Sequence, residues 1–319
     1  MVSIIIPNYN GAAFLEPCIH SILEQDLSAQ EREIIVIDNG STDASPDLLA
    51  KFGSQITVIA NRENLGFTGA INQGVAASTG KLLLLFNNDA ILGPNALSGL
   101  IEFLNHAPVD VAAVQPLLLN AKDPARIDSA GIALGPYFRP RDDLHGQPVE
   151  LSPQSPCEIW GACAACVLLK RGVFDQAGGF DLDYFFDVDD VDFAFRVRWL
   201  GYRFMLAPQF HVLHHRSPAT KKLPSVHMQR HLQNYLITID KDMPGSWHWR
   251  LLLYRFQHDL FMIPHHLRNG SLKVVIKAWC FFISQWKNTG RKRKIIMATS
   301  RFTALDMKRQ LLSFVRSAP

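Results

Sequence analysis

Four short apolar runs, each followed by a segment of helical pattern, constrain the fold of this chain more than any other feature. The runs span residues 2–6, 33–37, 56–59 and 82–86. The last run, Leu-Leu-Leu-Leu-Phe, is apolar throughout, as expected of a strand that is buried on both faces. Helices are expected between the runs, over residues 12–23, 45–52 and 68–77. This alternation predicts an α/β fold with a mostly parallel sheet flanked by helices.

A polar segment follows each of the four runs directly. These segments are Pro7–Gly11, Asp38–Asp43, Asn61–Phe67 and Asn87–Asp89. Asn, Asp, Gly and Ser also form turns for local reasons, so one such segment alone would indicate little. In a parallel sheet, however, the carboxyl ends of the strands meet at one edge, and ligands bind there. Four such segments in succession predict a polar ligand cleft at that edge.

A cluster of carboxylates follows later in the chain, with four of them between Asp187 and Asp192. Carboxylates this close raise each other's pKa, so a purely structural role gains little from them. Asp189 or Asp190 could cap a helix that runs through residues 195–199, but capping needs only one of the four. A site that accepts a proton or faces a cation has more use for such a cluster. The cluster therefore predicts a functional role.

The carboxylate at the end of the fourth run suits a metal ion. Mg²⁺ is often held by only one or two protein carboxylates, with substrate phosphates and water completing its shell. Asp89 is placed for this role, with a metal that bridges a nucleotide diphosphate. The cluster of His211, His214 and His215 could supply another ligand. Taken singly, each of these His residues is more often a surface or core residue.

The remaining cleft residues suggest a binding side and a reacting side. Asp38 could accept hydrogen bonds from a base or a ribose, and Tyr9 could pack against the base. Asp189 and Asp190 would lie opposite the leaving group, where a carboxylate can deprotonate an acceptor hydroxyl.

Charge divides the chain into two parts. Residues 1–219 hold 14 Lys and Arg against 25 Asp and Glu, whereas residues 220–319 hold 18 against 4. The basic part has a helical, apolar-rich pattern and contains the quartet Arg291-Lys292-Arg293-Lys294. Such helices can lie on an anionic membrane surface, pack on the main domain or on a second copy of the chain, or bind nucleic acid. We favour the membrane surface, followed by packing or a homo-oligomer. Nucleic acid is the least favoured partner.

The cysteine content, the start of the chain and the length of its apolar runs suggest the cellular compartment. Five cysteines, an odd and small number, fit a reducing environment. The chain begins with a strand-like run rather than a secretory signal, and it contains no run of 18 apolar residues. We expect a cytoplasmic protein that is peripheral at the inner face of the cell membrane.

The order of these motifs resembles glycosyltransferase family 2. The segments that carry the resemblance, besides the acidic cluster and the His pair, are Val2–Asn10, Val36–Asp43, Asn64–Phe67, Phe86–Asp89, Gly161–Cys163 and Gly178–Asp181. The chain looks most like the bacterial rhamnosyltransferase-type enzymes of polysaccharide assembly, over about residues 1–220. The resemblance implies a GT-A (Rossmann-like) catalytic domain over 1–220, while the charge and the helical pattern predict a helical, basic C-terminal region over 221–319. It also implies a nucleotide-diphosphate sugar donor, a divalent metal (Mg²⁺ or Mn²⁺) and inversion at the anomeric carbon.

The resemblance also assigns roles on the donor side. The residues that it places at the nucleotide sugar are Pro7, Tyr9, Asn10, Asp38, Asn64, Gly66, Asn87 and Asn88. Asp89 matches the final carboxylate of the D-x-D motif of the family, and Asn87 stands in place of the first. With one negative charge fewer, metal binding before the nucleotide arrives should be weak.

On the acceptor side, the Glu-Asp pair of the family appears here as Asp189-Asp190. Asp190 is then the base and Asp189 its neighbour. His214 matches the metal-proximal His, with His215 as the second choice, and Trp160 is expected to border the acceptor.

Together these assignments imply an inverting transfer of a sugar, in particular L-rhamnose from dTDP-rhamnose. The acceptor would be a hydroxyl of a glycan, either polyprenyl-diphosphate-linked or at the cell surface. One alternative is a hexosyl- or N-acetylhexosaminyltransferase of the same fold that uses a UDP-sugar. The other is a nucleotide-sugar-binding protein without turnover, which the intact Asp89 and Asp190 disfavour.

Overall fold

The computed structural model describes residues 1–216 and 224–315. The expected boundary between residues 220 and 221 lies outside the described residues. The strands are β1 (Val2–Asn8), β2 (Arg32–Asp38), β3 (Thr57–Ala60), β4 (Leu82–Phe86), β5 (Ala90–Leu92), β6 (Val111–Asn120), β7 (Asp123–Ser129), β8 (Ile132–Leu134), β9 (Pro140–Asp142), β10 (Cys157–Ile159), β11 (Cys166–Lys170) and β12 (Arg203–His214). The helices are α1 (Ala12–Leu23), α2 (Ser45–Ala50), α3 (Gly66–Ala76), α4 (Ala96–His106), α5 (Arg171–Gln176), α6 (Asp189–Trp199), α7 (Pro224–Asp242), α8 (Trp247–Phe261), α9 (Ile263–Arg268), α10 (Leu272–Thr299) and α11 (Ala304–Phe314).

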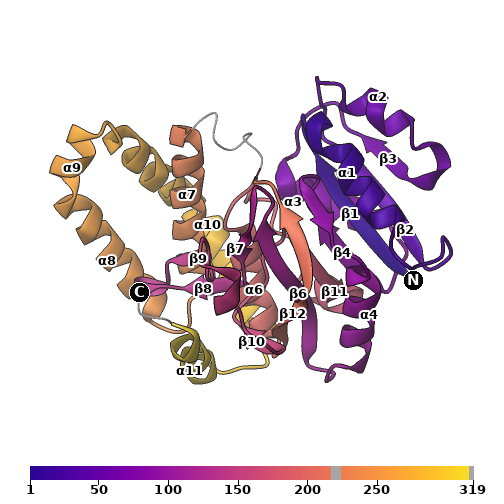
Figure 1. Cartoon of the computed structure of the whole chain (residues 1–319). Coiled ribbons are helices and arrows are strands. Elements are labelled where there is room, and N and C mark those ends of the chain that lie inside the picture. Colours follow the sequence, from indigo (N-terminus) through magenta and orange to yellow (C-terminus); the bar gives the residue numbers. More distant parts are fainter. Residues whose placement is uncertain (217–223, 316–319) are drawn as a thin grey trace.

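One large sheet forms the centre of the fold, with helices on both faces (Figure 1). Its main path runs β10-β12-β6-β11-β4-β1-β2-β3. The four strands expected from residues 1–90 pair in parallel, as the alternation of strands and helices predicted. Beyond them the sheet is mixed, because β11 runs antiparallel to both β4 and β6. The carboxyl ends of β1, β2 and β4 therefore meet at one edge.

The sheet is buried on both faces because its central strands carry apolar side chains on both of them. In β1, Ile4 and Ile6 point into the core beneath α1 and α4, while Ile5 points to the opposite core with α3. Strand residues alternate between the two faces, so a run without polar positions can serve two cores at once. The all-apolar β4 does the same, and this confirms the expected doubly covered sheet.

A third core joins the sheet domain to the C-terminal helices. Helix α6 faces the sheet through Phe193 and Val197, and it faces α7, α10 and α11 through Phe195 and Trp199. A helix with apolar side chains on two faces needs a packing surface against each of them. The C-terminal helices supply that second surface, and Figure 1 shows them standing beside the sheet. The expected helical, basic C-terminal region is confirmed.

Part of the basic quartet is used inside the fold. Arg293 donates hydrogen bonds to the carbonyl oxygens of Asp240, Lys241 and Met243, at the end of α7. The last carbonyls of a helix have no partners within the helix, and a cation there also meets the negative end of the helix dipole. Arg291 and Lys294 remain exposed. In the described residues, no helix is both long and apolar enough to cross a membrane.

Candidate active site

A cleft of about 860 Å³ opens at the carboxyl ends of β1, β2 and β4, where the sequence predicted it. Eight of the residues named from the sequence line this first chamber: Pro7, Tyr9, Asn64, Gly66, Asn87, Asn88, Asp89 and His214. They come from segments up to about 200 residues apart, brought to one edge by the parallel strands. The first chamber is thus built mainly from the loops that directly follow strands.

Asp38 and Asn10 stand outside this lining. Asp38 is 5 % exposed, and its Oδ1 accepts hydrogen bonds from Asn8 Nδ2 (2.9 Å) and Ser41 Oγ (2.5 Å). Asn10 has a positive φ of 51° and accepts a hydrogen bond from the backbone N–H of Thr42 at 2.8 Å. Both residues tie the end of β1 and the loop after it to the loop after β2.

Asp89 and His214 are in contact with each other in the lining of the first chamber. His214 ends β12, and its Nε2 lies 3.3 Å from Asp89 Oδ1. Its Nδ1 lies 2.8 Å from Oδ2 of Asp128, a buried residue of β7 that is also paired with Arg216. Burial by itself lowers the pKa of His214, but the hydrogen bonds and charges of Asp128 and Asp89 outweigh it and raise the pKa to about 9. This chain of contacts fixes the orientation of the imidazole.

The same pair is suited to a divalent cation. Once its imidazole has released its proton, His214 forms with the Asp89 carboxylate a donor set that suits a metal such as Mn²⁺. In the described parts of the chain, no group of three His, Cys, Asp or Glu could hold a metal ion by itself. Such a sparse protein set fits an ion that is completed by the phosphates of its substrate and by water.

Asp189 and Asp190 begin α6 and line a second, smaller chamber of about 350 Å³. Neither caps the helix, since the N-cap position is Val188 and no side chain bonds there. Burial, followed by the charge of Asp142, raises the pKa of Asp190 to about 7. Burial and the charge of Asp190 raise the pKa of Asp189 well above its usual range. Both carboxyls of the pair therefore take up a proton more readily than an ordinary Asp does.

The two chambers adjoin. Six residues line both of them: Phe67, Asn87, Phe186, His214, Arg216 and His231. Asp89 lines the first chamber and Asp190 lines the second. The two carboxylates are therefore on different sides of the six residues that both chambers share. The fourth carboxylate of the acidic cluster, Asp192, lies elsewhere, because it is buried against Arg196 and Lys241.

Three other His and Trp residues named from the sequence stand outside the lining of both chambers. Trp160 is 1 % exposed, and its ring packs against Phe195 at 5.0 Å between centroids. His215 packs against Phe14, with ring centroids 5.1 Å apart. The carbonyl oxygen of His211 accepts a hydrogen bond from the N–H of Gly93. The structure thus separates His214 from its neighbours in the cluster.

Sequence reasoning missed the wall that α7 contributes. His227, Met228 and His231 line the first chamber, and Phe185 and Phe186 lie beside them. The two His residues are four positions apart, which places them on one helical face. That spacing was a signal in the sequence, but nothing local connects it to strands more than a hundred residues earlier. Asp128, the partner of His214, had no signal of its own.

Comparison with known proteins bears on this site. A family model described as Glycosyl transferase family 2 matches residues 3–177. The chain is 26% identical over 270 residues to the N-acetylglucosaminyl-diphospho-decaprenol L-rhamnosyltransferase of Mycobacterium tuberculosis, covering 77% of this chain and 87% of that protein. That relative was named for a sugar transfer to a lipid-linked acceptor.

Two solved structures share the fold. The structure of GalNAc-T7 with UDP, GalNAc and Mn²⁺ has a TM-score of 0.60 at 16% identity, over 76% of this chain and 48% of that one. The mannosyltransferase PcManGT from Pyrobaculum calidifontis, in complex with GDP-Man and Mn²⁺, has a TM-score of 0.56 at 18% identity, over 98% of this chain and 84% of that one. These likenesses show the GT-A fold that the sequence predicted.

Proposed function

Because the chain belongs to glycosyltransferase family 2, we propose that its cleft transfers a sugar from a nucleoside diphosphate to an acceptor hydroxyl with inversion at the anomeric carbon. The observation that carries this proposal is the division of the cleft, with Asp89 and His214 in one chamber and Asp190 in the next. A single displacement needs a site for the leaving group on one side of the sugar and a base on the other.

Asp190 is the base in this proposal. The acceptor hydroxyl gives its proton to the Asp190 carboxylate as its oxygen bonds to the anomeric carbon. The bond to the diphosphate breaks in the same step, and its electron pair leaves with the diphosphate. A base works best when its pKa lies near the working pH, and the pKa of about 7 meets that condition. Asp189 lies beside it, and burial and the charge of Asp190 raise the pKa of Asp189.

Asp89 and His214 would hold the divalent metal, Mg²⁺ or Mn²⁺. When bound there, the metal supplies positive charge to the diphosphate. The chain itself keeps His214 in place through Asp128, and it keeps the amides of Asn87 and Asn88 beside the carboxylate. On the far side of the chamber, Tyr9 is 45 % exposed at the rim and is free to stack on the nucleotide base.

For the donor and the acceptor we propose L-rhamnose from dTDP-rhamnose and a polyprenyl-diphosphate-linked glycan. The support is the relative from Mycobacterium tuberculosis, whose name states both a rhamnosyl transfer and a diphospho-decaprenol acceptor. The UDP and GalNAc of one structural relative and the GDP-Man of the other keep a hexosyl or N-acetylhexosaminyl donor as the second candidate.

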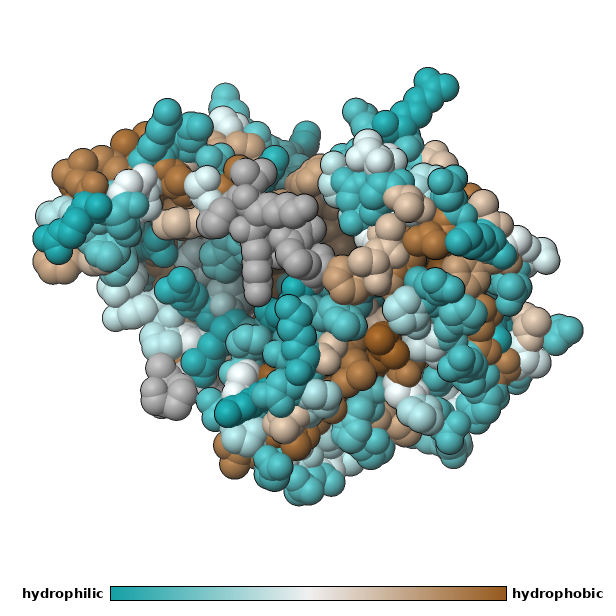
Figure 2. All heavy atoms as spheres, turned by 45° about the horizontal axis from the view of Figure 1, so that its top comes forward, coloured by the Kyte–Doolittle hydropathy of each residue, from teal (hydrophilic) through white to brown (hydrophobic). Residues whose placement is uncertain are grey.

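A lipid-linked acceptor requires contact with a membrane, and we propose that α8, α9 and α10 provide it from the inner face. Large apolar side chains on these helices are exposed, among them Phe261 (82 %), Leu267 (64 %) and Trp286 (63 %). Figure 2 shows apolar side chains gathered at the end of the molecule that these helices form. Arg268, Lys273, Lys277 and Lys287 are exposed on the same helices. Aromatic and basic residues together suit an anionic interface.

Liposome binding tests the membrane proposal. Phe261→Glu should reduce binding of the full chain to vesicles that contain anionic lipid, since it replaces an inserting ring with a repelled charge. Val109→Glu is the matched control, because Val109 is 87 % exposed on the sheet domain. Equal loss in both variants, or in neither, would refute the assignment of this surface.

The transfer itself is tested by release of nucleoside diphosphate from a panel of donors, with Mg²⁺, Mn²⁺ or EDTA. We expect release from dTDP-rhamnose in the presence of a synthetic lipid-diphosphate-linked N-acetylglucosamine, and loss of release with EDTA. Release from a UDP-hexose instead would overturn the proposed donor. Turnover that EDTA does not change would overturn the metal.

A further inference from the structure

The backbone directly before Asp189 makes an unusual turn. Asp187 and Val188 have φ values of 72° and 63°, so two consecutive residues other than glycine are left-handed. A β-branched residue such as Val rarely adopts this conformation, and it persists only where the surroundings hold it. Helix α6 begins at the next residue, so this turn decides where Asp189 and Asp190 point.

Asn234 of α7 holds the turn directly. Its side chain is fully buried, and its Nδ2 donates hydrogen bonds to the carbonyl oxygens of Phe186 (2.8 Å) and Asp187 (2.7 Å). Both partners can only accept, so the amide has one productive orientation. His231, on the same face of α7, places its Nδ1 3.1 Å from Asp187 Oδ2. The backbone and the side chain of Asp187 are thus both fixed by α7.

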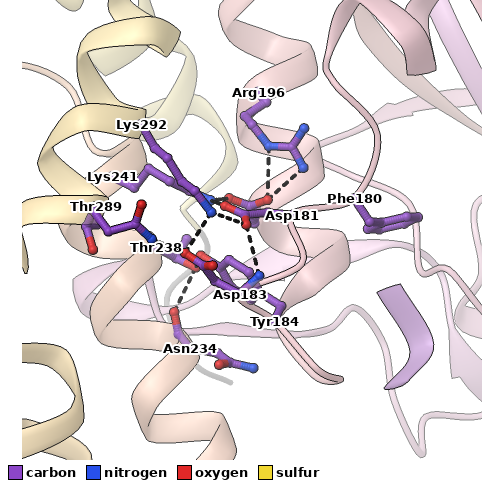
Figure 3. Close-up of polar contacts among 12 residues, drawn as sticks. Phe180, Asp181, Asp183, Tyr184, Arg196, Asn234, Thr238, Lys241, Thr289 and Lys292 are labelled. Carbon is purple, nitrogen blue, oxygen red and sulfur yellow. Dashed lines mark hydrogen bonds and ion pairs between the residues drawn. The ribbon is translucent and has the colours of Figure 1, made fainter. Parts of the chain in front are cut away.

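Helix α7 is itself tied to the segment that leads into the turn. Lys241 Nζ lies 2.5 Å from Asp181 Oδ2, and Lys292 Nζ of α10 lies 2.5 Å from the other oxygen of the same carboxylate. Thr238 and the Tyr184 hydroxyl are hydrogen bonded at 2.7 Å. Figure 3 shows these contacts converging on residues 181–184 from the two helices. The segment therefore cannot move independently of the C-terminal helices.

The opposite side of the segment packs on the donor wall. The backbone N–H of Phe67 donates to the carbonyl oxygen of Phe185 at 2.7 Å. Gly66 has a positive φ of 77°, and a Cβ added to it would lie 2.3 Å from that same oxygen. The turn before the base is therefore clamped between α3, beside the donor, and α7.

We propose that Asn234 is a positioning residue for the transfer reaction: it holds the left-handed turn at Asp187 and Val188, and through that turn it aims the Asp190 carboxylate at the acceptor hydroxyl. This inference rests on the proposed function of Asp190. It gives α7 a part in catalysis, in addition to its packing on α6. A misplacement of about 1 Å at a reacting group costs about 10²-fold in rate, which sets the effect to expect.

The test compares Asn234→Ala with Tyr235→Phe in the full chain, with nucleoside diphosphate release from dTDP-rhamnose as the assay. Tyr235→Phe is the matched control, because the Tyr235 hydroxyl donates to a backbone carbonyl outside the turn, that of Tyr137. We expect Asn234→Ala to lower kcat by about 100-fold, with KM for the donor within about twofold. Tyr235→Phe should leave kcat within about threefold. Asn234→Ser keeps one donor and should fall between them, and it replaces the Ala variant if that variant does not fold.

The double variant Asp190→Asn with Asn234→Ala separates positioning from general destabilisation. If Asn234 acts through Asp190, the double variant is no slower than Asp190→Asn alone, because groups that act as a unit are not additive. Multiplied losses would overturn the proposal, as would an unchanged kcat in Asn234→Ala. A fully active Asp190→Asn beside an impaired Asn234→Ala would instead refute the proposed base.

Discussion

The donor half of the cleft and its α7 wall are built in different ways. The donor half comes from loops at the ends of β1, β2 and β4, and its residues sit directly after apolar runs. The α7 wall comes from a helix far along the chain, whose side chains reach the cleft only through tertiary packing. The comparison teaches that a parallel sheet brings its binding residues to one edge through its topology. The base on the other side of the cleft depends instead on helices that come later in the sequence.

The largest loss of activity is expected from a substitution at Asp190, the proposed base. Asp190→Asn should lower kcat by about 10³-fold, since a general base contributes between about 10² and 10⁴. Nucleotide binding, measured by titration with a nucleoside diphosphate, should stay within about twofold because Asp190 is outside the first chamber. Asp192→Asn is a poor control because Asp192 is a buried ion-pair partner. Asp175→Asn is a better one, because Asp175 occupies an exposed position of α5. Normal turnover by Asp190→Asn would refute the assignment of Asp190 as the base.

A smaller loss is expected in the donor half. Asp89→Asn should lower kcat by about 10²-fold and raise the metal concentration needed for half-maximal rate, because the neutral amide holds a cation less well. A titration with Mn²⁺ checks this. Unchanged metal dependence would show that Asp89 is not the ligand, whatever happens to the rate.

The unfolding free energy of the protein tests how the α7 wall is held in place. Arg293→Met removes hydrogen bonds to three carbonyls at the end of α7 and should cost about 2 kcal/mol of unfolding free energy. Arg291→Met, at an exposed position of the same quartet, should change it by less than about 0.5 kcal/mol. Denaturant unfolding of both variants measures the difference. Equal effects would mean that the quartet is a surface feature throughout.

The pH profile gives the smallest effect. Burial and the charge of Asp142 raise the pKa of Asp190 to about 7, so the carboxyl is protonated below that pH and cannot accept a proton. The value of kcat should fall about tenfold for each pH unit below 7 and level off above it. Asp142→Asn should move this limb to lower pH, since it removes a negative charge that keeps Asp190 protonated. A limb that stays in place would remove Asp142 from the account.

The sequence was informative where function follows local order. The positions of Asn64 and Asp89 follow from the strands that precede them, and the parallel pairing of β1, β2, β3 and β4 followed from the same pattern. The antiparallel β11 did not, because a short apolar run carries no sign of its direction. In the sequence, Lys292 and Arg293 resemble surface charges. In the structure, Lys292 pairs with the Asp181 carboxylate and Arg293 donates to backbone carbonyls, and only tertiary packing brings these partners together.

The anomeric configuration of the product is the measurement that tests the central claim most directly. Transfer from dTDP-rhamnose to a lipid-diphosphate-linked acceptor can be followed by NMR of the new glycosidic bond. A single displacement with Asp190 as base predicts a configuration opposite to that of the donor. Retention would contradict the account, because a single displacement by the acceptor hydroxyl inverts the anomeric carbon.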